Sequence, residues 1–167
     1  MKALIQRVSR GSVTIDGNCV ASIDRGFVVL LGIRDGDTEA DAAKLAEKTA
    51  DLRIFTDGND KMNQSLRDTS GQALVISQFT LYADTRKGNR PSFVQAAAPG
   101  PAENLYNRYV THLRDILGEE KVRTGVFRAM MTVEIINDGP VTVELSTDRP
   151  AQDPREPNTR SLDENGC

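Results

Sequence analysis

The 167-residue sequence predicts a single compact α/β domain, in which a mixed sheet of barrel-like strands packs against two main helices. Short apolar stretches of strand length recur along the chain, and two longer segments repeat their apolar residues at helical spacing. The composition, 38% hydrophobic and 27% charged, is typical of a folded chain with one core.

The first elements expected along the chain are strands. Residues 3–8 alternate between polar and apolar side chains, and residues 12–15 and 19–23 flank the turn-forming segment DGN at 16–18. Residues 27–33 (FVVLLGI) are continuously apolar, which is typical of a central strand covered on both faces.

A first helix is expected to follow Thr38, which is a suitable N-cap residue. Glu39 and Asp41 then place carboxylates in the first turn, where they favour the helix dipole. Its apolar face consists of Ala42, Leu45, Ala46, Thr49 and Leu52. We expect a short strand within residues 52–55 and a polar loop at 56–60.

Residues 63–66 read as loop, and residues 73–81 (ALVISQFTL) read as a second buried strand. The segment PGP at 99–101 sets up a second helix with proline in its first turn, and Gly118 ends it. The apolar stripe of this helix consists of Leu105, Tyr109, His112, Leu113, Ile116 and Leu117.

Two further strands, at 131–136 and 140–145, are expected on either side of a turn at 137–139. Beyond them the chain is polar and rich in proline. We therefore expect a folded domain over residues 1–148 and a disordered polar tail over residues 149–167.

The composition also bounds the partners. No apolar run reaches the length of a membrane span, and the first residues read as a strand, so we expect a cytoplasmic protein without a membrane partner. Cys19, read as a small half-buried residue, and Cys167 lack the spacing of a metal site. The formal charge is −3, and residues 151–167, with four acidic and two basic side chains, account for −2 of it. The near-neutral remainder permits one local basic patch for RNA, and no DNA partner is expected.

The common catalytic arrangements are not evident. The chain has a single histidine, His112, whose place on an apolar helix stripe favours a packing or surface role. A Ser-His-Asp or Cys-His site therefore has no second candidate for its base. Glycine-rich phosphate loops and zinc-ligand spacings are also missing, so we expect neither a cofactor nor a metal.

Two segments depart from the pattern of a core. In SQFTL at 77–81 three polar residues follow an apolar strand, where each buried polar group needs a partner. Either Ser77 and Thr80 satisfy backbone groups there, or the strand end opens on a pocket, as it does in many α/β sheets. NDGPVT at 137–142 reads as a hairpin turn, but Pro140 lacks an N–H for the strand ladder and Gly-Pro bonds have a real tendency to be cis.

Together these two segments resemble the paired signature motifs of the D-aminoacyl-tRNA deacylases, the family that includes D-tyrosyl-tRNA deacylase. Further segments resemble the family in the same order, so that the resemblance covers about residues 1–145. They are LIQRV at 4–8, VLLGI ending at Ile33, RIF at 53–55, KMN at 61–63, RPSF at 90–93 and TGVF at 124–127.

The resemblance implies a two-fold homodimer that hydrolyses the ester of D-aminoacyl-tRNA and acts in chirality proofreading of translation. It implies that Gly139 and Pro140, joined by a cis bond, enter the site of the partner with both carbonyl oxygens facing the aminoacyl group. Arg7 is implied to hold this element in place. A rigid pair of carbonyls excludes an L side chain but not glycine, so glycyl-tRNA is a second expected substrate.

The resemblance also implies that Ser77, Gln78, Phe79 and Thr80 line the pocket for the ester and the terminal adenosine, with Met131 at the adenine. Two mechanisms stay open. Thr80 acts as a nucleophile, or Gln78 and backbone amides near Phe79 orient the ester and a water, assisted by the ribose 2′-hydroxyl. We favour the second, because the sequence offers Thr80 no evident general base.

Arg86, Lys87 and Arg90 form a basic loop that is a candidate for contact with tRNA phosphates, although an ordinary solvated loop has the same composition. Two other functions are considered. A non-catalytic RNA-binding module of the same fold would not require both signature motifs, and a general esterase with a threonine nucleophile lacks a base.

Overall fold

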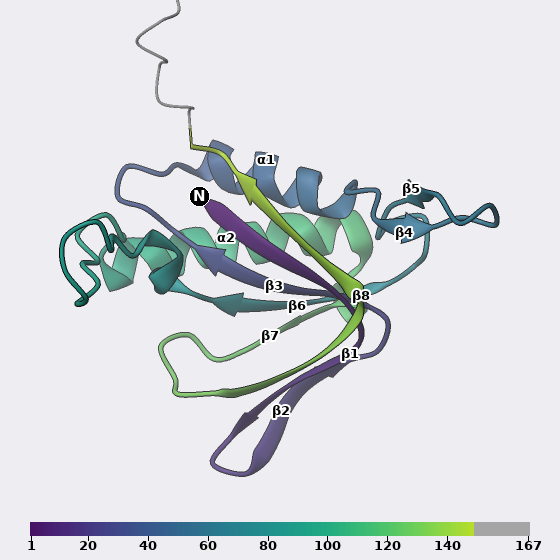
Figure 1. Cartoon of the computed structure of the whole chain (residues 1–167), viewed down its shortest axis with the longest axis horizontal. Helices are drawn as coiled ribbons and strands as arrows, with labels where there is room; N and C mark the ends of the chain where they lie inside the picture. Colours follow the sequence, from purple (N-terminus) through teal and green to yellow (C-terminus); the bar gives the residue numbers. More distant parts are fainter. Residues whose placement is uncertain (149–167) are drawn as a thin grey trace, which may run out of the picture.

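The computed structural model describes residues 1–148, and the expected tail at 149–167 lies outside the described residues. The described chain forms a strongly curved mixed sheet with two helices packed on one face (Figure 1). The strands are β1 (Lys2–Ile15), β2 (Asn18–Ile23), β3 (Gly26–Gly32), β4 (Phe55–Thr56), β5 (Met62–Gln64), β6 (Gln72–Ser77), β7 (Val122–Thr124) and β8 (Thr132–Ser146). The helices are α1 (Glu39–Ala50) and α2 (Pro99–Leu117), with 3-10 turns η1 (Phe79–Tyr82) and η2 (Glu119–Lys121).

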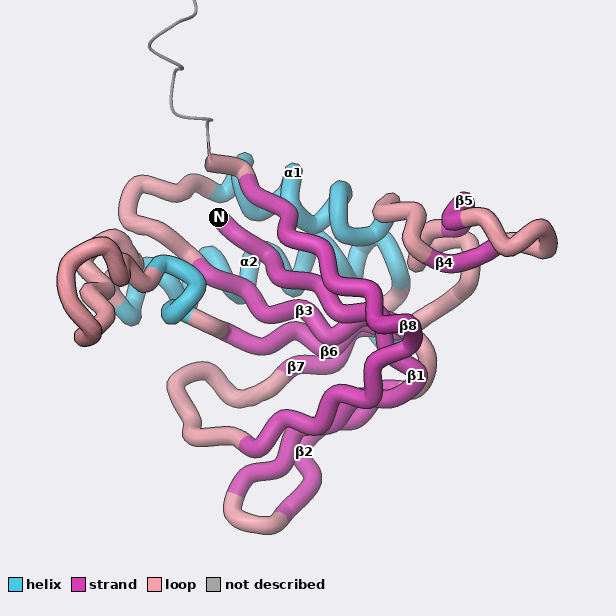
Figure 2. The backbone as a smooth tube through the Cα atoms, in the orientation of Figure 1, coloured by secondary structure: helices cyan, strands magenta, loops and turns pink. Residues whose placement is uncertain are grey.

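The main sheet has the order β2-β1-β3-β6-β7, and β8 pairs with β1 along the other edge of β1. Pairing is antiparallel around β1 and parallel from β3 through β6 to β7, so the predicted mixed sheet is confirmed. Figure 2 shows β2 and the N-terminal half of β8 curling away from the helices, which gives the sheet its barrel-like shape.

Both helices begin where the sequence predicts, but α1 ends at Ala50, so Leu52, which was expected on its apolar face, lies beyond the helix. The Thr38 hydroxyl accepts a hydrogen bond from the Asp41 amide at 3.3 Å, and the Asp41 carboxylate accepts one from the Thr38 amide at 2.9 Å. This capping box satisfies two amides that the helix cannot pair itself. Pro99 stands in the first turn of α2, and Gly118 caps its end with φ at 102°. Between residues 1 and 148, no helix is long and apolar enough to cross a membrane.

The hydrophobic core lies on both faces of the sheet, because alternate residues of β3 point to opposite sides. Phe27 and Leu31 pack toward the helices with Leu45 and Tyr109, and all four are fully buried. Val28 packs in a second cluster, which the curled half of the sheet covers on the other face. Burial of β3 on both faces agrees with the continuous apolar run.

Three strand predictions need correction. The strands expected at 3–8 and 12–15 are one continuous strand, β1. The strand expected over 73–81 ends at Ser77, where the chain turns into η1. The short strand expected within residues 52–55 is instead β4 at Phe55–Thr56, and part of the segment expected as loop at 63–66 belongs to β5, which pairs with β4 in a small separate sheet.

The hairpin expected around residues 137–139 does not form. β8 runs through this segment and pairs with β1 on both sides of it, with Asn137 opposite Val8 and Thr142 opposite Gln6. The register shifts between these pairs, so the turn-forming residues produce a bulge instead of a reversal. The bond between Gly139 and Pro140 is cis. Cys19, expected to be half-buried, is exposed.

Candidate active site

The end of β6 is held tightly against β3. The Gln78 amide donates a hydrogen bond to the Leu31 carbonyl at 2.8 Å, and the Leu81 amide closes the first turn of η1 on the Gln78 carbonyl at 3.3 Å. A side chain at Gly32 would lie 3.0 Å from the Leu81 Cβ and 3.1 Å from the Gln78 carbonyl oxygen. Glycine at position 32 therefore lets η1 approach the neighbouring strand closely.

A pocket of about 590 Å³ opens where the parallel strands β3, β6 and β7 end. Ser77, Gln78, Phe79 and Met131 are among its lining residues, so four sequence-predicted site residues lie around one cavity. The other lining residues are Leu31, Ile33, Ile76, Phe93, Ala96, Ala97, Pro99, Ala102, Phe127, Arg128, Ala129, Met130 and Val133. A largely apolar cavity with a few polar groups at the carboxyl ends of parallel strands is a typical ligand site of α/β proteins.

Aromatic and sulfur-containing side chains shape this pocket. The rings of Phe79 and Phe93 meet edge to face with centroids 5.0 Å apart, although 58% of Phe79 stays exposed. A Cβ at Gly125 would lie 2.7 Å from the Met131 sulfur, so the absence of a side chain there makes room for Met131. Exposed aromatic faces of this kind are suited to stacking with a planar ligand.

Thr80 lies beside the pocket rather than on its wall. It is exposed, and the Gln78 side-chain amide donates a hydrogen bond to its hydroxyl oxygen. Within residues 1–148 no carboxylate, imidazole or amine is recorded as a hydrogen-bond partner of Thr80, and His112 is not among the pocket residues. Gln78 thus connects the pocket wall to Thr80.

Tyr82 anchors the other end of η1. Its hydroxyl donates to the Asp148 carboxylate, with O–O distances of 3.3 and 3.4 Å. Burial, followed by the negative charges of Asp37 and Asp148, raises the pKa of Tyr82 well above its usual range. The phenol therefore stays neutral and donates its hydrogen bond to the segment just after β8.

Arg7 holds the bulge of β8 within its own chain. Its Nε donates to the Asp138 carbonyl at 2.9 Å, and its Nη1 donates to the Ile54 carbonyl at 2.6 Å. Only 8% of Arg7 is exposed, and its Nε also lies 3.4 Å from the Asp138 carboxylate. A Cβ at Gly139 would lie 2.8 Å from the Val141 amide nitrogen, so this position accommodates glycine and no larger residue.

The Gly139-Pro140 bulge and the pocket lie at different ends of the sheet. Arg7, which contacts the bulge, pairs with Phe27, whereas Ser77 at the pocket pairs with Leu31. These two positions of β3 are separated by four residues, or roughly 13 Å at about 3.3 Å per residue. One chain therefore does not bring these two groups of site residues together.

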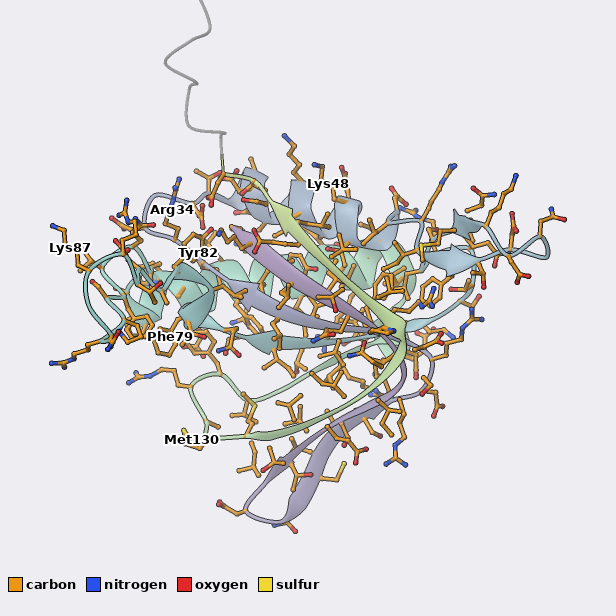
Figure 3. The ribbon with its side chains drawn as sticks, in the orientation of Figure 1. Arg34, Lys48, Phe79, Tyr82, Lys87 and Met130 are labelled. Carbon is orange, nitrogen blue, oxygen red and sulfur yellow. The ribbon has the colours of Figure 1, made fainter. Side chains whose placement is uncertain are left out.

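The basic loop lies at the same end of the molecule as the pocket, as Figure 3 shows for Lys87 and Phe79. Two backbone hydrogen bonds between Asp84 and Ser92, of 2.7 and 2.9 Å, close the base of the loop. Arg86 binds the Asp84 carboxylate through two side-chain nitrogens at 2.6 and 2.9 Å. These hydrogen bonds lower the pKa of Asp84 to about 2. Arg86 is thus paired inside the loop, while Lys87 and Arg90 are both exposed.

Several pocket residues were not assigned by sequence reasoning. Phe93 and Phe127 belong to the segments RPSF and TGVF, which contributed to the family resemblance, but neither phenylalanine was given a role in the site. Arg128 and Met130 lie in the loop between β7 and β8, where no motif points to them. Within the described residues, no cluster of three or more His, Cys, Asp or Glu side chains could hold a metal ion.

The chain is similar to known proteins over nearly its whole described length. The family model described as D-Tyr-tRNA(Tyr) deacylase matches residues 4–146. A D-aminoacyl-tRNA deacylase of Carboxydothermus hydrogenoformans is 53% identical over 145 residues, which is 86% of this chain and 97% of that protein. A D-aminoacyl-tRNA deacylase of Halalkalibacterium halodurans is 55% identical over 143 residues, with the same two coverages.

Two solved structures share the fold. One, titled "c-Myc DNA Unwinding Element Binding Protein", has a TM-score of 0.85 and 42% identity, and the match covers 90% of this chain and 100% of that one. The other, titled "Structural Analysis of a probable eukaryotic D-amino acid tRNA deacylase", has a TM-score of 0.75 and covers 86% and 97%. At 20% identity the second likeness supports the fold alone.

Together with the fold and its pocket, the family model and the deacylase relatives define the class of protein: small α/β hydrolases that act on aminoacyl-tRNA. Within that class, the chain belongs to the D-aminoacyl-tRNA deacylase family, described by its family model as D-Tyr-tRNA(Tyr) deacylase. The family resemblance predicted from the SQFTL and NDGPVT motifs is thereby confirmed.

Proposed function

We propose that this protein hydrolyses the ester that joins a D-amino acid to the 3′ end of tRNA, with glycyl-tRNA as a second substrate. The pocket carries this proposal, because the Ser77-Gln78-Phe79 segment lines an open cavity in a chain that the deacylase family model matches over residues 4–146. We assign the activity to the domain at residues 1–148 and to the cytoplasm, where aminoacyl-tRNA is used.

The complete site requires a homodimer. β8 is an edge strand whose apolar side chains are all partly or largely exposed, an arrangement that soluble proteins normally cover. A second copy seated against this strand buries it and brings Gly139 and Pro140 of the partner subunit to the pocket that the chain's own bulge does not reach. The two-fold arrangement makes both sites equivalent.

Selection between D and L substrates follows from this arrangement. The carbonyl oxygens of Gly139 and Pro140 of the partner subunit form a wall that has no side-chain rotamer with which to yield. An L side chain collides with that wall, a D side chain points away from it, and glycine has no side chain to exclude. In each chain Arg7 fixes the bulge through the Asp138 carbonyl.

Hydrolysis proceeds by positioning and by stabilisation of the oxyanion. Water attacks the ester carbonyl carbon, and the bond between this carbon and the ribose 3′-oxygen breaks. The leaving 3′-oxygen takes up the proton that the attacking water loses, assisted by the 2′-hydroxyl. Gln78 and the backbone amides near Phe79 orient the ester, while Phe79 and Met131 contact the terminal adenosine. The Gln78 amide donates to the Thr80 hydroxyl oxygen, which makes that oxygen a weaker nucleophile and favours water.

The decisive test measures deacylation of matched D- and L-aminoacyl-tRNA by the purified protein in the presence of a chelator. We expect hydrolysis of the D-aminoacyl and glycyl esters and none of the L ester, with no effect of the chelator. Binding of tRNA without turnover would instead identify a non-catalytic RNA-binding module. Equal hydrolysis of D and L esters would identify a general esterase.

A further inference from the structure

A single charged side chain lines the pocket within the described part of the chain. Of the lining residues, only Arg128 carries a charge, and the others are apolar or neutral. Arg128 follows Phe127 in the loop that connects β7 to β8, three positions before Met131. Among the residues that line this pocket, a ligand therefore meets one cation and no anion.

The guanidinium of Arg128 is available to a ligand. Arg128 is exposed, and among residues 1–148 no carboxylate lies within 4.0 Å of its side-chain nitrogens. Most arginines that structure this fold, such as Arg7 and Arg86, are bound to a carboxylate or a carbonyl. Within residues 1–148, Arg128 has no such partner to explain its place at the pocket.

The backbone at Arg128 also departs from the usual preference of its residue type. Its φ is 64°, in the left-handed region that favours glycine. The loop is fixed around it, because the Gly125 amide donates to the Val75 carbonyl at 3.1 Å and the Ala129 amide to the Val126 carbonyl at 3.2 Å. An arginine where glycine fits better indicates that its side chain contributes something other than stability.

The proposed substrate carries two kinds of charged group that could lie near this cation. An aminoacylated 3′ end carries a positive α-ammonium on the amino acid and negative phosphates on the nucleotides. A guanidinium repels the ammonium and binds phosphate through paired hydrogen bonds. Resting on the proposed function, we infer that Arg128 binds the phosphate on the 5′ side of the terminal adenosine.

This contact makes Arg128 a substrate-binding residue on the nucleotide side of the pocket. The β7–β8 loop that carries it and the loop before α2 lie at the same end of the sheet (Figure 1). The nucleotide chain approaches between them, with the adenosine at Met131 and its phosphate at Arg128. The phosphate then fixes the distance from the tRNA backbone to the ester.

The test compares the binding of adenosine 5′-monophosphate with that of adenosine, measured by calorimetry on the full chain. Wild-type protein is expected to bind the monophosphate about tenfold more tightly, as one charge-assisted hydrogen-bonded pair allows. Arg128→Gly is expected to lose this preference without losing affinity for adenosine, and Arg128→Lys to recover part of it. Arg123→Ala, which removes an exposed arginine outside the pocket, serves as the matched control and keeps the preference.

The melting temperature separates a role in substrate binding from a structural role for Arg128. If Arg128 binds substrate, the melting temperature of Arg128→Gly is expected to equal or exceed that of the wild type, because glycine suits a φ of 64°. The KM for D-aminoacyl-tRNA is expected to rise about tenfold with kcat unchanged. An Arg128→Gly variant that keeps the tenfold preference, or wild-type protein that shows none, overturns the inference. A wild type with this preference but without deacylase activity overturns only the proposed function.

Discussion

At the scale of single residues, Arg7 shows how one buried side chain links distant segments of the chain. Its guanidinium joins β1 to the bulge of β8 through Asp138 and to the segment before β4 through Ile54. Both acceptors are backbone carbonyls, so their positions are set by the backbone and do not depend on a side-chain rotamer. In the proposed dimer, this single cation sets the position of the wall that the partner's substrate meets.

Replacement of Arg7 by methionine tests that link. The substitution keeps much of the volume but leaves two carbonyls without their charged donor, which is expected to reduce the free energy of unfolding by about 2–4 kcal/mol. Denaturant unfolding measures this loss. Activity on D-aminoacyl-tRNA is expected to persist, while hydrolysis of the L ester rises because the wall is no longer fixed. An unchanged ratio of D to L rates would show that Arg7 serves stability alone.

Thr80 provides the second test at this scale, because it separates the two mechanisms. Thr80→Val removes the hydroxyl but keeps the shape, and attack by water predicts a fall in kcat of no more than about tenfold. A covalent mechanism predicts loss of measurable turnover and an acyl-enzyme that can be trapped in the wild type. Gln78→Ala is the matched comparison, and loss of an oxyanion-orienting donor is expected to lower kcat by about 10²–10³.

At the scale of elements, the loop between Asp84 and Ser92 carries two exposed cations, Lys87 and Arg90, which form no ion pair within residues 1–148. The Arg86–Asp84 pair belongs to the loop itself, and since the pKa of Asp84 is about 2, its carboxylate is ionised at any ordinary assay pH. The pKa of Asp84 in the folded protein lies below the unfolded value of about 3.9. The Arg86–Asp84 pair therefore stabilises the folded loop above pH 4, and this stabilisation is lost only as the pH falls toward 2. Titration of this pair is therefore not expected to change the affinity for tRNA between pH 5 and 8.

Charge reversal in this loop tests contact with tRNA. Lys87→Glu combined with Arg90→Glu is expected to weaken tRNA binding and to reduce the slope of log K against log salt by about 1.5. The ratio of D to L hydrolysis should stay unchanged, because the loop is separate from the β8 bulge. Lys44→Glu combined with Lys48→Glu makes the same change of charge on α1, where both lysines are exposed, and is the control. Equal salt slopes for the two double variants would remove the loop from the interface.

At the scale of the whole molecule, the pocket and the bulge of one chain are too far apart to act on the same substrate. Each chain contains a pocket near Ser77 and, at the other end of β3, a bulge at Gly139-Pro140. A monomer offers the two features separately. The dimer proposed here joins the pocket of one subunit to the bulge of the other, so chiral selection is a property of the pair.

Mixing of subunits tests this arrangement directly. Gln78→Ala is expected to inactivate the pocket, and Pro140→Ala to leave it active but permissive for L-aminoacyl-tRNA. In a mixed dimer, the surviving pocket belongs to the Pro140→Ala chain and receives the intact bulge of the Gln78→Ala chain. Adding excess Gln78→Ala protein should therefore suppress L hydrolysis while D hydrolysis remains. If L hydrolysis persists in mixed dimers, each bulge serves its own subunit.

The local sequence alone determined the helices and most of the sheet, because caps, turns and apolar periodicity act over a few residues. Thr38, Gly118 and the run at 27–33 belong to elements that form where the sequence places them. The two motifs also identified the family, since SQFTL and NDGPVT are legible without coordinates.

Only the tertiary structure decided what NDGPVT becomes. A turn signal predicts a reversal, but β1 offers a pairing edge on both sides of the segment, and the hydrogen bonds of a continuous β8 outweigh the local preference. The pocket walls at Phe93, Phe127 and Arg128 likewise emerge from loops brought together by three parallel strands. Contacts between segments far apart in the sequence leave no local periodicity, so the sequence pattern does not predict them and they become visible only in the folded structure.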